Sequence, residues 1–430
     1  MSRLRSGLLL SVAAAVVSLA ACSSKDSSTG IHDPNPDPTA NTPVAHDGLL
    51  ASTPEAEGIS HSALVKLVDD AIDQKSEALV VLRNGKIVYE SYFGKKNEPI
   101  YAMSASKSFV SLAYGFMLAD HSLASLDEPV VKYDSAFDDV DARKASTTIR
   151  HLLSQTSGLG PGRALTGDPD IEHFADQSPL LFAPGGAWQY SNNGVDFLSA
   201  LTEKIAGKKL DAYLNEKLFT PLGIPETSWL LDTKGVPYGA GELRIRAIDM
   251  AKVGQVILDG GKWNGQQIID PDWIAQSEAV SSSYNPQYGL LWWRNAAPTG
   301  YEITNDLLDQ WEGNGIPKSI TDKLRPGVGQ SFYPYTSYQS FVRSLVTLED
   351  VATINQVLNT GDHVPPARLA SVGTVNGYYF SGWLGQFMYV LPSKNLVAVR
   401  MRRSTSADYT STAELNGFPA FLLDAYALVP

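Results

Sequence analysis

The stretch that decides the fold is MSASKSFVSLAYGFMLA, residues 103–119. Beyond Lys107 it is apolar on nearly every side, which indicates a buried central helix. It opens with the pattern S-x-x-K, formed by Ser104 and Lys107. Because residues three apart share one face of a helix, this pattern places the Lys107 amine beside the Ser104 hydroxyl.

Such a pair has the chemistry of a nucleophile and its base. A serine is a poor nucleophile unless a neighbouring base takes its proton. A lysine can be that base where desolvation lowers its pKa, and a buried helix supplies desolvation. The alternative is an ordinary N-cap serine beside a solvated lysine. We predict Ser104 as the nucleophile and Lys107 as its partner, a hypothesis that other motifs must support.

The segments on either side predict strands near both ends of the chain and helices between them. Asn84-Gly85 lies between two β-rich runs, which is a strong hairpin signal, and helical periodicity begins at Ser60. Further helices are predicted at 147–157, 193–220, 246–259, 272–277 and 414–428, and strands at 288–295, 387–392 and 395–403. This order predicts an α+β fold: an antiparallel sheet built from both termini and flanked by helices, with a mostly helical region in the middle.

A second motif, Tyr190-Ser191-Asn192, follows the turn Pro184-Gly185-Gly186 and precedes an apolar helix. A tyrosine hydroxyl near the Ser104–Lys107 pair can relay a proton to a leaving group. The side chain of Asn192 can hydrogen-bond both Lys107 and a substrate. The alternative for Tyr190 is a buried loop tyrosine.

Taken in order, four motifs resemble the serine β-lactamase/penicillin-binding-protein superfamily. They are S-x-x-K at 104–107, HLLSQTSGL at 151–159, FAPGGAWQYSN at 182–192 and PLGIPETSW at 221–229. The resemblance covers roughly 55–295 and 377–430 and is strongest to the class C β-lactamase-like branch, which includes esterases and 6-aminohexanoate-dimer hydrolase. It implies a β-lactamase/transpeptidase-like fold, an α/β sandwich. It also implies a Ser104 acyl-enzyme, with Lys107 and Tyr190 sharing the acid–base work.

The third motif of that family, K-T-G on a strand, has no lysine here. Its counterpart is FSGWLGQ, residues 380–386. The resemblance implies an oxyanion hole made by the N–H groups of Ser104 and Trp383, with Asn192, Gly382 and Gly385 contacting the substrate. Backbone donors tolerate a change of side chain, so hydrolysis is still expected. Because the family lysine assists recognition of a β-lactam carboxylate, its absence argues against that substrate. The Trp383 side chain is either an apolar wall of the site or a core residue of the sheet.

Residues 296–376 have no counterpart of similar length in typical relatives. The segment is rich in aromatic residues and contains the helical run SFVRSLVTLEDVATINQVL, residues 340–358. Long insertions with structure of their own are usually lids or binding loops. We hypothesise that this insertion covers the pocket and sets specificity. The alternative is a decoration that packs only on itself.

The N-terminus resembles a secretory signal that ends in a lipobox. A basic start is followed by a short apolar stretch and by Leu19-Ala20-Ala21-Cys22, with the one cysteine of the chain at its end. Cleavage before Cys22 and its acylation are expected, and Ser23 favours the outer membrane, facing the periplasm or the cell surface. The following polar, Pro-rich stretch predicts a disordered tether to the membrane.

The predicted organisation is a lipoprotein signal peptide at 1–21, a disordered tether at 22–47 and a serine hydrolase at 48–430. Within the hydrolase, the sheet comes from about 55–100 and 285–430, the helical part from about 104–280 and the insertion from about 296–376.

Composition excludes several other classes of function. The net charge of −12 argues against nucleic acid as a partner. One cysteine and scattered histidines leave no zinc pattern, and no G-x-S-x-G elbow of an α/β-hydrolase occurs. We predict a serine hydrolase that cleaves a small ester, amide or peptide-like substrate without cofactor or metal, and that meets the membrane only through its lipid anchor. The alternatives are D,D-peptidase, penicillin-binding or β-lactamase activity, or a non-catalytic surface lipoprotein on the same fold.

Overall fold

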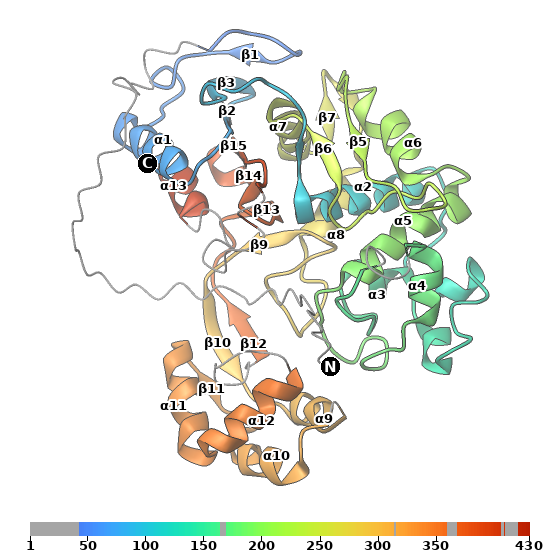
Figure 1. Ribbon diagram of the computed structural model, residues 1–430. Helices are drawn as coiled ribbons and strands as arrows, with labels where there is room; N and C mark the ends of the chain where they lie inside the picture. Colours follow the sequence, from blue (N-terminus) through green and yellow to red (C-terminus); the bar gives the residue numbers. More distant parts are fainter. Residues whose placement is uncertain (1–42, 164–168, 314, 359–367, 406–407, 409–419) are drawn as a thin grey trace, which may run out of the picture. The chain divides into compact units, whose positions relative to one another are not determined.

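The computed structural model describes residues 43–163, 169–313, 315–358, 368–405, 408 and 420–430 (Figure 1). The predicted signal peptide, Cys22 and most of the predicted tether lie outside these residues. The tether was expected to reach residue 47, but His46 and Asp47 already contact the folded part. His46 Nε2 lies 2.6 Å from Glu90 Oε2, and Asp47 accepts a hydrogen bond from Arg246.

The described residues divide into two compact units. The described residues within 43–297 and 374–430 form the main unit, and those within 298–373 form the insert unit. In the described part of the chain, every helix is too short or too polar to cross a membrane.

A seven-stranded sheet is the centre of the main unit. Its strand order is β1-β3-β2-β15-β14-β13-β9, and every neighbouring pair is antiparallel except β1 with β3. The strands are β1 (Leu50–Ala51), β2 (Ala78–Arg83), β3 (Lys86–Ser91), β9 (Trp293–Asn295), β13 (Gly377–Gly382), β14 (Gln386–Leu391) and β15 (Leu396–Met401). Asn84 and Gly85 join β2 to β3 with positive φ angles of 53° and 75°, as a two-residue hairpin turn requires. The predicted sheet from both termini is confirmed.

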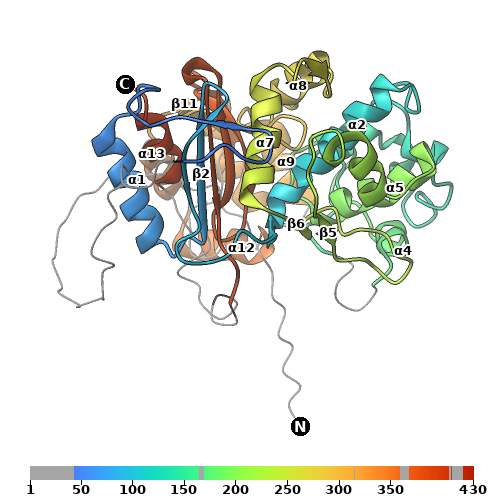
Figure 2. The same cartoon turned by 90° about the horizontal axis from the view of Figure 1, so that it is seen from above.

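Both faces of this sheet are covered, because the central strands are apolar on both sides. In β2, Val80 and Leu82 join the core shared with α7 (Ala247–Leu258), whereas Leu79 and Val81 join the core shared with α1 (His61–Asp73) and α13 (Phe421–Ala427). Figure 2 shows α1 and α13 on one side of β2 and α7 on the other. This period of two assigns alternate residues to the two layers.

Helix α2 (Ser106–Ala119) is the buried core of the helical region, as its composition predicts. Every residue from Ser106 to Met117 is buried. Around it lie α3 (Ile149–Leu153), α4 (Ile171–Gln177), α5 (Asn192–Ala206), α6 (Leu210–Leu214) and α8 (Pro271–Glu278). A small sheet has the strand order β4 (Ile100–Tyr101), β6 (Leu243–Ile245) and β5 (Ser228–Trp229), and β4 lies directly before the start of α2 in the chain.

The predicted strand at 288–295 is wrong over most of its length. Only Trp293–Asn295 joins the sheet as β9. Before it the chain turns, because Gly289 N–H bonds to Trp292 O and Leu291 has a φ of 60°. The Leu291 N–H instead bonds to the carbonyl of Leu153, the last residue of α3.

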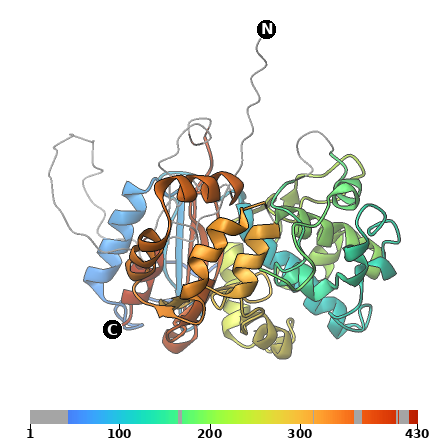
Figure 3. The same ribbon diagram turned by 90° about the horizontal axis from the view of Figure 1, so that it is seen from below.

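The insert unit has its own small sheet and its own apolar core. Strand β10 (Pro298–Glu302) pairs with β11 (Ser331–Phe332) and β12 (Arg368–Val372). The helices, orange in Figure 3, are α9 (Asn305–Gly313), α10 (Lys318–Leu324), α11 (Tyr335–Leu345) and α12 (Leu348–Leu358). The predicted run 340–358 is two helices, because Thr347 and Asp350 exchange backbone-to-side-chain hydrogen bonds that cap the start of α12. That this unit covers a pocket stays a prediction.

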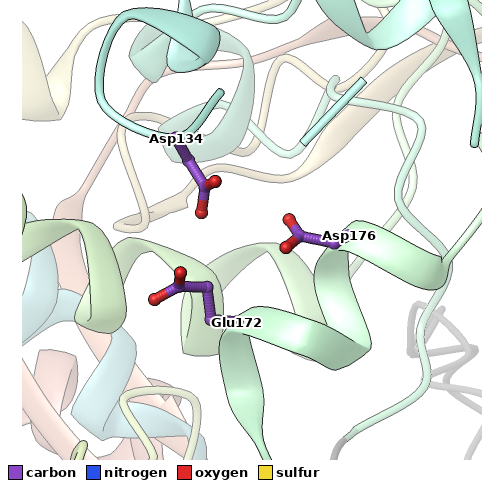
Figure 4. A group of neighbouring side chains, drawn as sticks. All are labelled: Asp134, Glu172 and Asp176. Atoms are coloured by element: carbon purple, nitrogen blue, oxygen red, sulfur yellow. The ribbon is translucent and has the colours of Figure 1, made fainter. Parts of the chain in front are cut away.

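Three carboxylates of the helical region point toward one another (Figure 4). They belong to Asp134, Glu172 and Asp176, and one oxygen of each lies within 4.8 Å of the others. An ammonium already lies among them: Lys204 Nζ is 2.8 Å from Glu172 Oε1 and 3.4 Å from Asp134 Oδ2. Asp176 is 7% exposed, and burial, reinforced by the two neighbouring carboxylates, raises its pKa to about 7. We interpret the group as an ion-pair cluster whose third carboxylate holds a proton.

This cluster predicts an unusual pH dependence of stability. Because the folded chain binds the Asp176 proton more tightly than the unfolded chain, folding should lose stability as the pH rises from about 4 to about 7. Asp176→Asn has no such loss, so at pH 8 it should be more stable than the wild type by on the order of 2 kcal/mol, with little difference at pH 4. Denaturant unfolding at both pH values measures this. The exposed Asp139→Asn is the control, and an Asp176→Asn effect that is the same at pH 4 and pH 8 would contradict the assignment.

Candidate active site

The predicted nucleophile and its base lie together at the start of α2. Ser104 is in a short 3₁₀ turn, Met103–Ala105, and Lys107 lies one turn further in the first turn of α2. Lys107 Nζ is 3.1 Å from Ser104 Oγ. Ser104 is partly exposed, whereas the Lys107 side chain is 1% exposed. A substrate can therefore reach Ser104 while the Lys107 amine stays shielded from solvent.

The surroundings of Lys107 favour its uncharged form. Burial lowers the pKa of Lys107 well below its usual value of 10.5, and the positive charge of Arg163 acts in the same direction. The carboxylates of Asp196 and Glu242 oppose these two effects. An uncharged amine at hydrogen-bond distance from a serine hydroxyl can take its proton.

Tyr190 completes the group. Its ring centroid is 4.8 Å from Lys107 Nζ. Burial raises the pKa of Tyr190 to about 12, although the nearby Ser104 hydroxyl and the charge of Arg163 act against the rise. The phenol is therefore protonated at neutral pH and can donate a proton to a leaving group. The structure thus brings Ser104, Lys107 and Tyr190 together.

Two motifs of the sequence pair with each other to hold Tyr190. Gln155 accepts hydrogen bonds from the residues on both sides of Tyr190. The backbone carbonyl of Gln155 accepts from Gln189 N–H at 2.9 Å, and its side-chain oxygen accepts from Ser191 N–H. Gly158 lies against the same loop, because a Cβ there would be 2.2 Å from Phe182 O. The motifs at 151–159 and 182–192, two of the four that carry the family resemblance, therefore contact each other in the fold.

Asn192 is placed differently from the prediction. It is the first residue of α5, which Ser191 caps by accepting the Gly194 N–H at 2.9 Å. The Asn192 side-chain nitrogen donates to Pro161 O at 3.2 Å. The predicted bond to Lys107 is absent from the hydrogen bonds of the described residues.

The turn between β13 and β14 lies against the segment that precedes the nucleophile. A Cβ on Gly382 would be 2.3 Å from Ala102 O and 3.0 Å from Met103 Cβ, so the close approach needs a glycine. Trp383, predicted to give the second oxyanion donor, comes next and is partly exposed. Gly385, predicted to contact the substrate, is buried and closes the turn by donating to Gly382 O at 3.1 Å.

A buried arginine holds this turn from behind. Arg400 in β15 donates to the carbonyls of Leu384 and Gly385, and to Ser76 Oγ at 2.7 Å. In the same turn region, Gln386 exchanges hydrogen bonds with the backbone of Arg402. Gln386, the last residue of the FSGWLGQ segment, thus bonds the start of β14 to the residue that follows β15.

The segment YGAGEL, residues 238–243, is part of the site but was missed from the sequence. Leu243 accepts from Ala102 N–H at 2.8 Å and donates to Ser106 Oγ at 3.1 Å. Ala240 O accepts from Lys107 Nζ at 2.5 Å. These hydrogen bonds hold the S-x-x-K turn at Ala102, before Ser104, and at Ser106 and Lys107, after it. The available signal was the closely spaced pair Gly239 and Gly241, since a Cβ at Gly239 would be 2.9 Å from a methyl group of Val110 on α2.

Aromatic side chains continue outward from Tyr190. Trp293 stacks on it with ring centroids 6.3 Å apart and stacks on Tyr379 at 6.2 Å. The ring centroid of Trp188 lies 6.4 Å from that of Tyr190 and 6.4 Å from that of Trp293. Trp188, Trp293 and Tyr379 are partly exposed and form what we call the aromatic wall.

Known proteins resemble this chain in sequence or fold to different extents. An uncharacterised protein of Alkalihalophilus pseudofirmus is 23% identical over 78% of this chain and 86% of its own length. Esterase EstB of Burkholderia gladioli is 27% identical over 44% of this chain, and the match spans only 58% of EstB. Among solved structures, EstCE1, a hydrolase with promiscuous acyltransferase activity, has the same fold with a TM-score of 0.54, 17% identity and coverage of 86% of this chain and 98% of EstCE1.

The decisive comparison is with a model of a whole family. The model described as Beta-lactamase matches residues 68–416, which include Ser104, Lys107, Tyr190 and the turn at Trp383. The resemblance seen in the four sequence motifs is therefore confirmed, and the chain belongs to the beta-lactamase family of hydrolases.

Proposed function

We propose that this chain cleaves an ester or amide through an acyl-enzyme on Ser104. The observation that carries the proposal is the 3.1 Å distance between the dry Lys107 amine and the accessible Ser104 hydroxyl. The intact Tyr190, whose ring centroid is 4.8 Å from Lys107 Nζ, argues against a non-catalytic protein on the same fold.

In the proposed mechanism, Lys107 takes the Ser104 proton as Oγ attacks the substrate carbonyl. The oxyanion is held by the N–H groups of Ser104 and Trp383, and each such donor stabilises the transition state by about 3 kcal/mol. The proton then passes from Lys107 through Tyr190 to the leaving group, and the C–O or C–N bond breaks. Water, deprotonated by the same pair, hydrolyses the acyl-enzyme and regenerates Ser104.

The aromatic wall supports an ester with an apolar or aromatic group as the substrate. Partly exposed rings beside a catalytic tyrosine bind apolar groups through burial and stacking. The strand β13 has no lysine, which disfavours a substrate with the carboxylate of a β-lactam. The similarity to EstB supports the same choice.

Ser104→Ala should reduce hydrolysis of p-nitrophenyl esters by about 10⁴-fold or more, because the nucleophile is lost. A fluorophosphonate serine probe should label the wild type and not this variant. Ser111→Ala is the matched control: it removes a buried hydroxyl without a hydrogen-bond partner from the same helix and should keep full activity. Labelling of Ser104→Ala would refute the assignment, and rapid labelling of the wild type by fluorescent penicillin would favour a penicillin-binding enzyme instead.

The activity should rise with pH through the Lys107 pKa, because only the uncharged amine accepts the Ser104 proton. Since burial lowers that pKa well below 10.5, the rising limb of kcat/KM should lie well below pH 10.5. Lys107→Arg keeps a charge that cannot be removed and should be inactive at every pH. The exposed Lys132→Arg should behave as the wild type, and recovery of Lys107→Arg at high pH would exclude Lys107 as the base.

We further propose that the chain is anchored in the cell envelope through lipid on Cys22, which the lipobox-like sequence before it supports. Cys22→Ser in a bacterial host should move the enzyme from the membrane fraction to the soluble fraction and abolish labelling by radioactive palmitate. Ser23→Ala should leave both unchanged. Unaltered membrane association of Cys22→Ser would contradict a lipid anchor at this residue.

A further inference from the structure

We propose that Arg163 is a positioning residue for the proton-accepting amine of Lys107, acting as a fixed positive charge held between Asp196 and Glu242. These three residues are called the Arg163 network. This inference rests on the proposed function, since it concerns the base of that reaction. Arg163 lies outside the four motifs that carry the family resemblance.

The guanidinium of Arg163 is fixed on several sides. Its Nε and Nη2 atoms donate to the two oxygens of Asp196 at 3.0 and 3.3 Å, and Nη1 donates to Glu242 at 2.8 Å. The central carbon of the guanidinium, Cζ, lies 5.4 Å from the ring centroid of Tyr238. The Asp196 side chain is 2% exposed and that of Arg163 is 18% exposed. A planar ion with this many partners has one orientation.

The network is joined to the nucleophile by consecutive hydrogen bonds. Asp196 Oδ1 accepts from Ala240 N–H at 2.8 Å, and Ala240 O accepts from Lys107 Nζ at 2.5 Å. Lys107 Nζ in turn is 3.1 Å from Ser104 Oγ. The buried carboxylate therefore holds Ala240, the residue whose carbonyl oxygen orients the amine.

The guanidinium is also close to the nucleophile in space. A Cβ at Gly241 would lie 3.4 Å from Arg163 Nη1 and 3.8 Å from the carbonyl carbon of Met103, the residue before Ser104. Gly241 therefore lies between the guanidinium and the catalytic turn, within van der Waals reach of both.

Members of the Arg163 network act on Lys107 with opposite signs. The Arg163 charge lowers the pKa of Lys107, while Asp196 and Glu242 raise it, and these are the charged groups that act on this amine. Arg163 also lowers the pKa of Tyr190. A salt bridge that only stabilised the loop would have no signed effect on the pH profile, so the signs distinguish the two roles.

The test compares pH profiles of kcat/KM for Arg163→Gln and Glu242→Gln with the wild type. Arg163→Gln removes the positive charge and leaves two carboxylates, so the rising limb should move up by about one pH unit. Glu242→Gln removes a negative charge, so the limb should move down by about one pH unit. At pH values below the rising limb, kcat/KM should therefore be about tenfold lower in Arg163→Gln and about tenfold higher in Glu242→Gln than in the wild type. Asp196 is left intact because it also holds Ala240.

Arg163→Lys retains the charge and should keep the limb close to that of the wild type. Arg150→Gln, which breaks the exposed pair of Arg150 with Asp127, is the matched control and should shift nothing. The unfolding midpoint of every variant is measured. If Arg163→Gln does not fold, the inference is tested by whether the rising limb of the Glu242→Gln pH profile moves to lower pH. Limbs that stay at the wild-type pH, or move the same way in both variants, overturn the inference. A wild type without Ser104-dependent hydrolysis would instead refute the proposed function.

Discussion

The whole site depends on keeping one lysine amine away from water. Lys107 lies in a helix that is buried from Ser106 to Met117, and 1% of its side chain is exposed. Charging an amine in such surroundings is costly, so the fold itself makes Lys107 a base. The apolar character of α2 is therefore a requirement of the proposed chemistry as well as of stability.

Three separate parts of the chain converge on the start of that helix. Gln155 holds the loop that carries Tyr190, and the backbone of Leu243 grips Ala102 and Ser106. Arg400 holds the β13–β14 turn whose Gly382 touches Ala102. Because β13 to β15 follow the helical region in sequence while β2 and β3 precede it, the sheet joins both ends of the chain, and its β13–β14 turn contacts the segment before the nucleophile.

Features set by local sequence were predictable, and those set by pairing of distant residues were not. The Asn84-Gly85 hairpin and the buried helix after Lys107 follow from spacing and composition alone, whereas the Ser104–Lys107 pair also needed the support of the other three motifs. Arg163, Asp196 and Glu242 were missed because charged residues so far apart in sequence meet only in the folded chain. The strand predicted at 288–295 failed because backbone bonds of Gly289 and Leu291 redirect an otherwise β-rich run. The break at Thr347 had a readable signal, T-x-x-D, which the helical periodicity of the run concealed.

The central claim is that the Lys107 amine is uncharged beside Ser104 at the pH where the enzyme works. Nuclear magnetic resonance of protein labelled with ¹³C and ¹⁵N in its lysine side chains tests it most directly, with Lys107→Arg assigning the signal. The account predicts that the Cε and Nζ shifts of Lys107 titrate with a midpoint well below 10.5 and already show a neutral amine in the active pH range. A Lys107 signal that titrates together with those of the exposed lysines would contradict it.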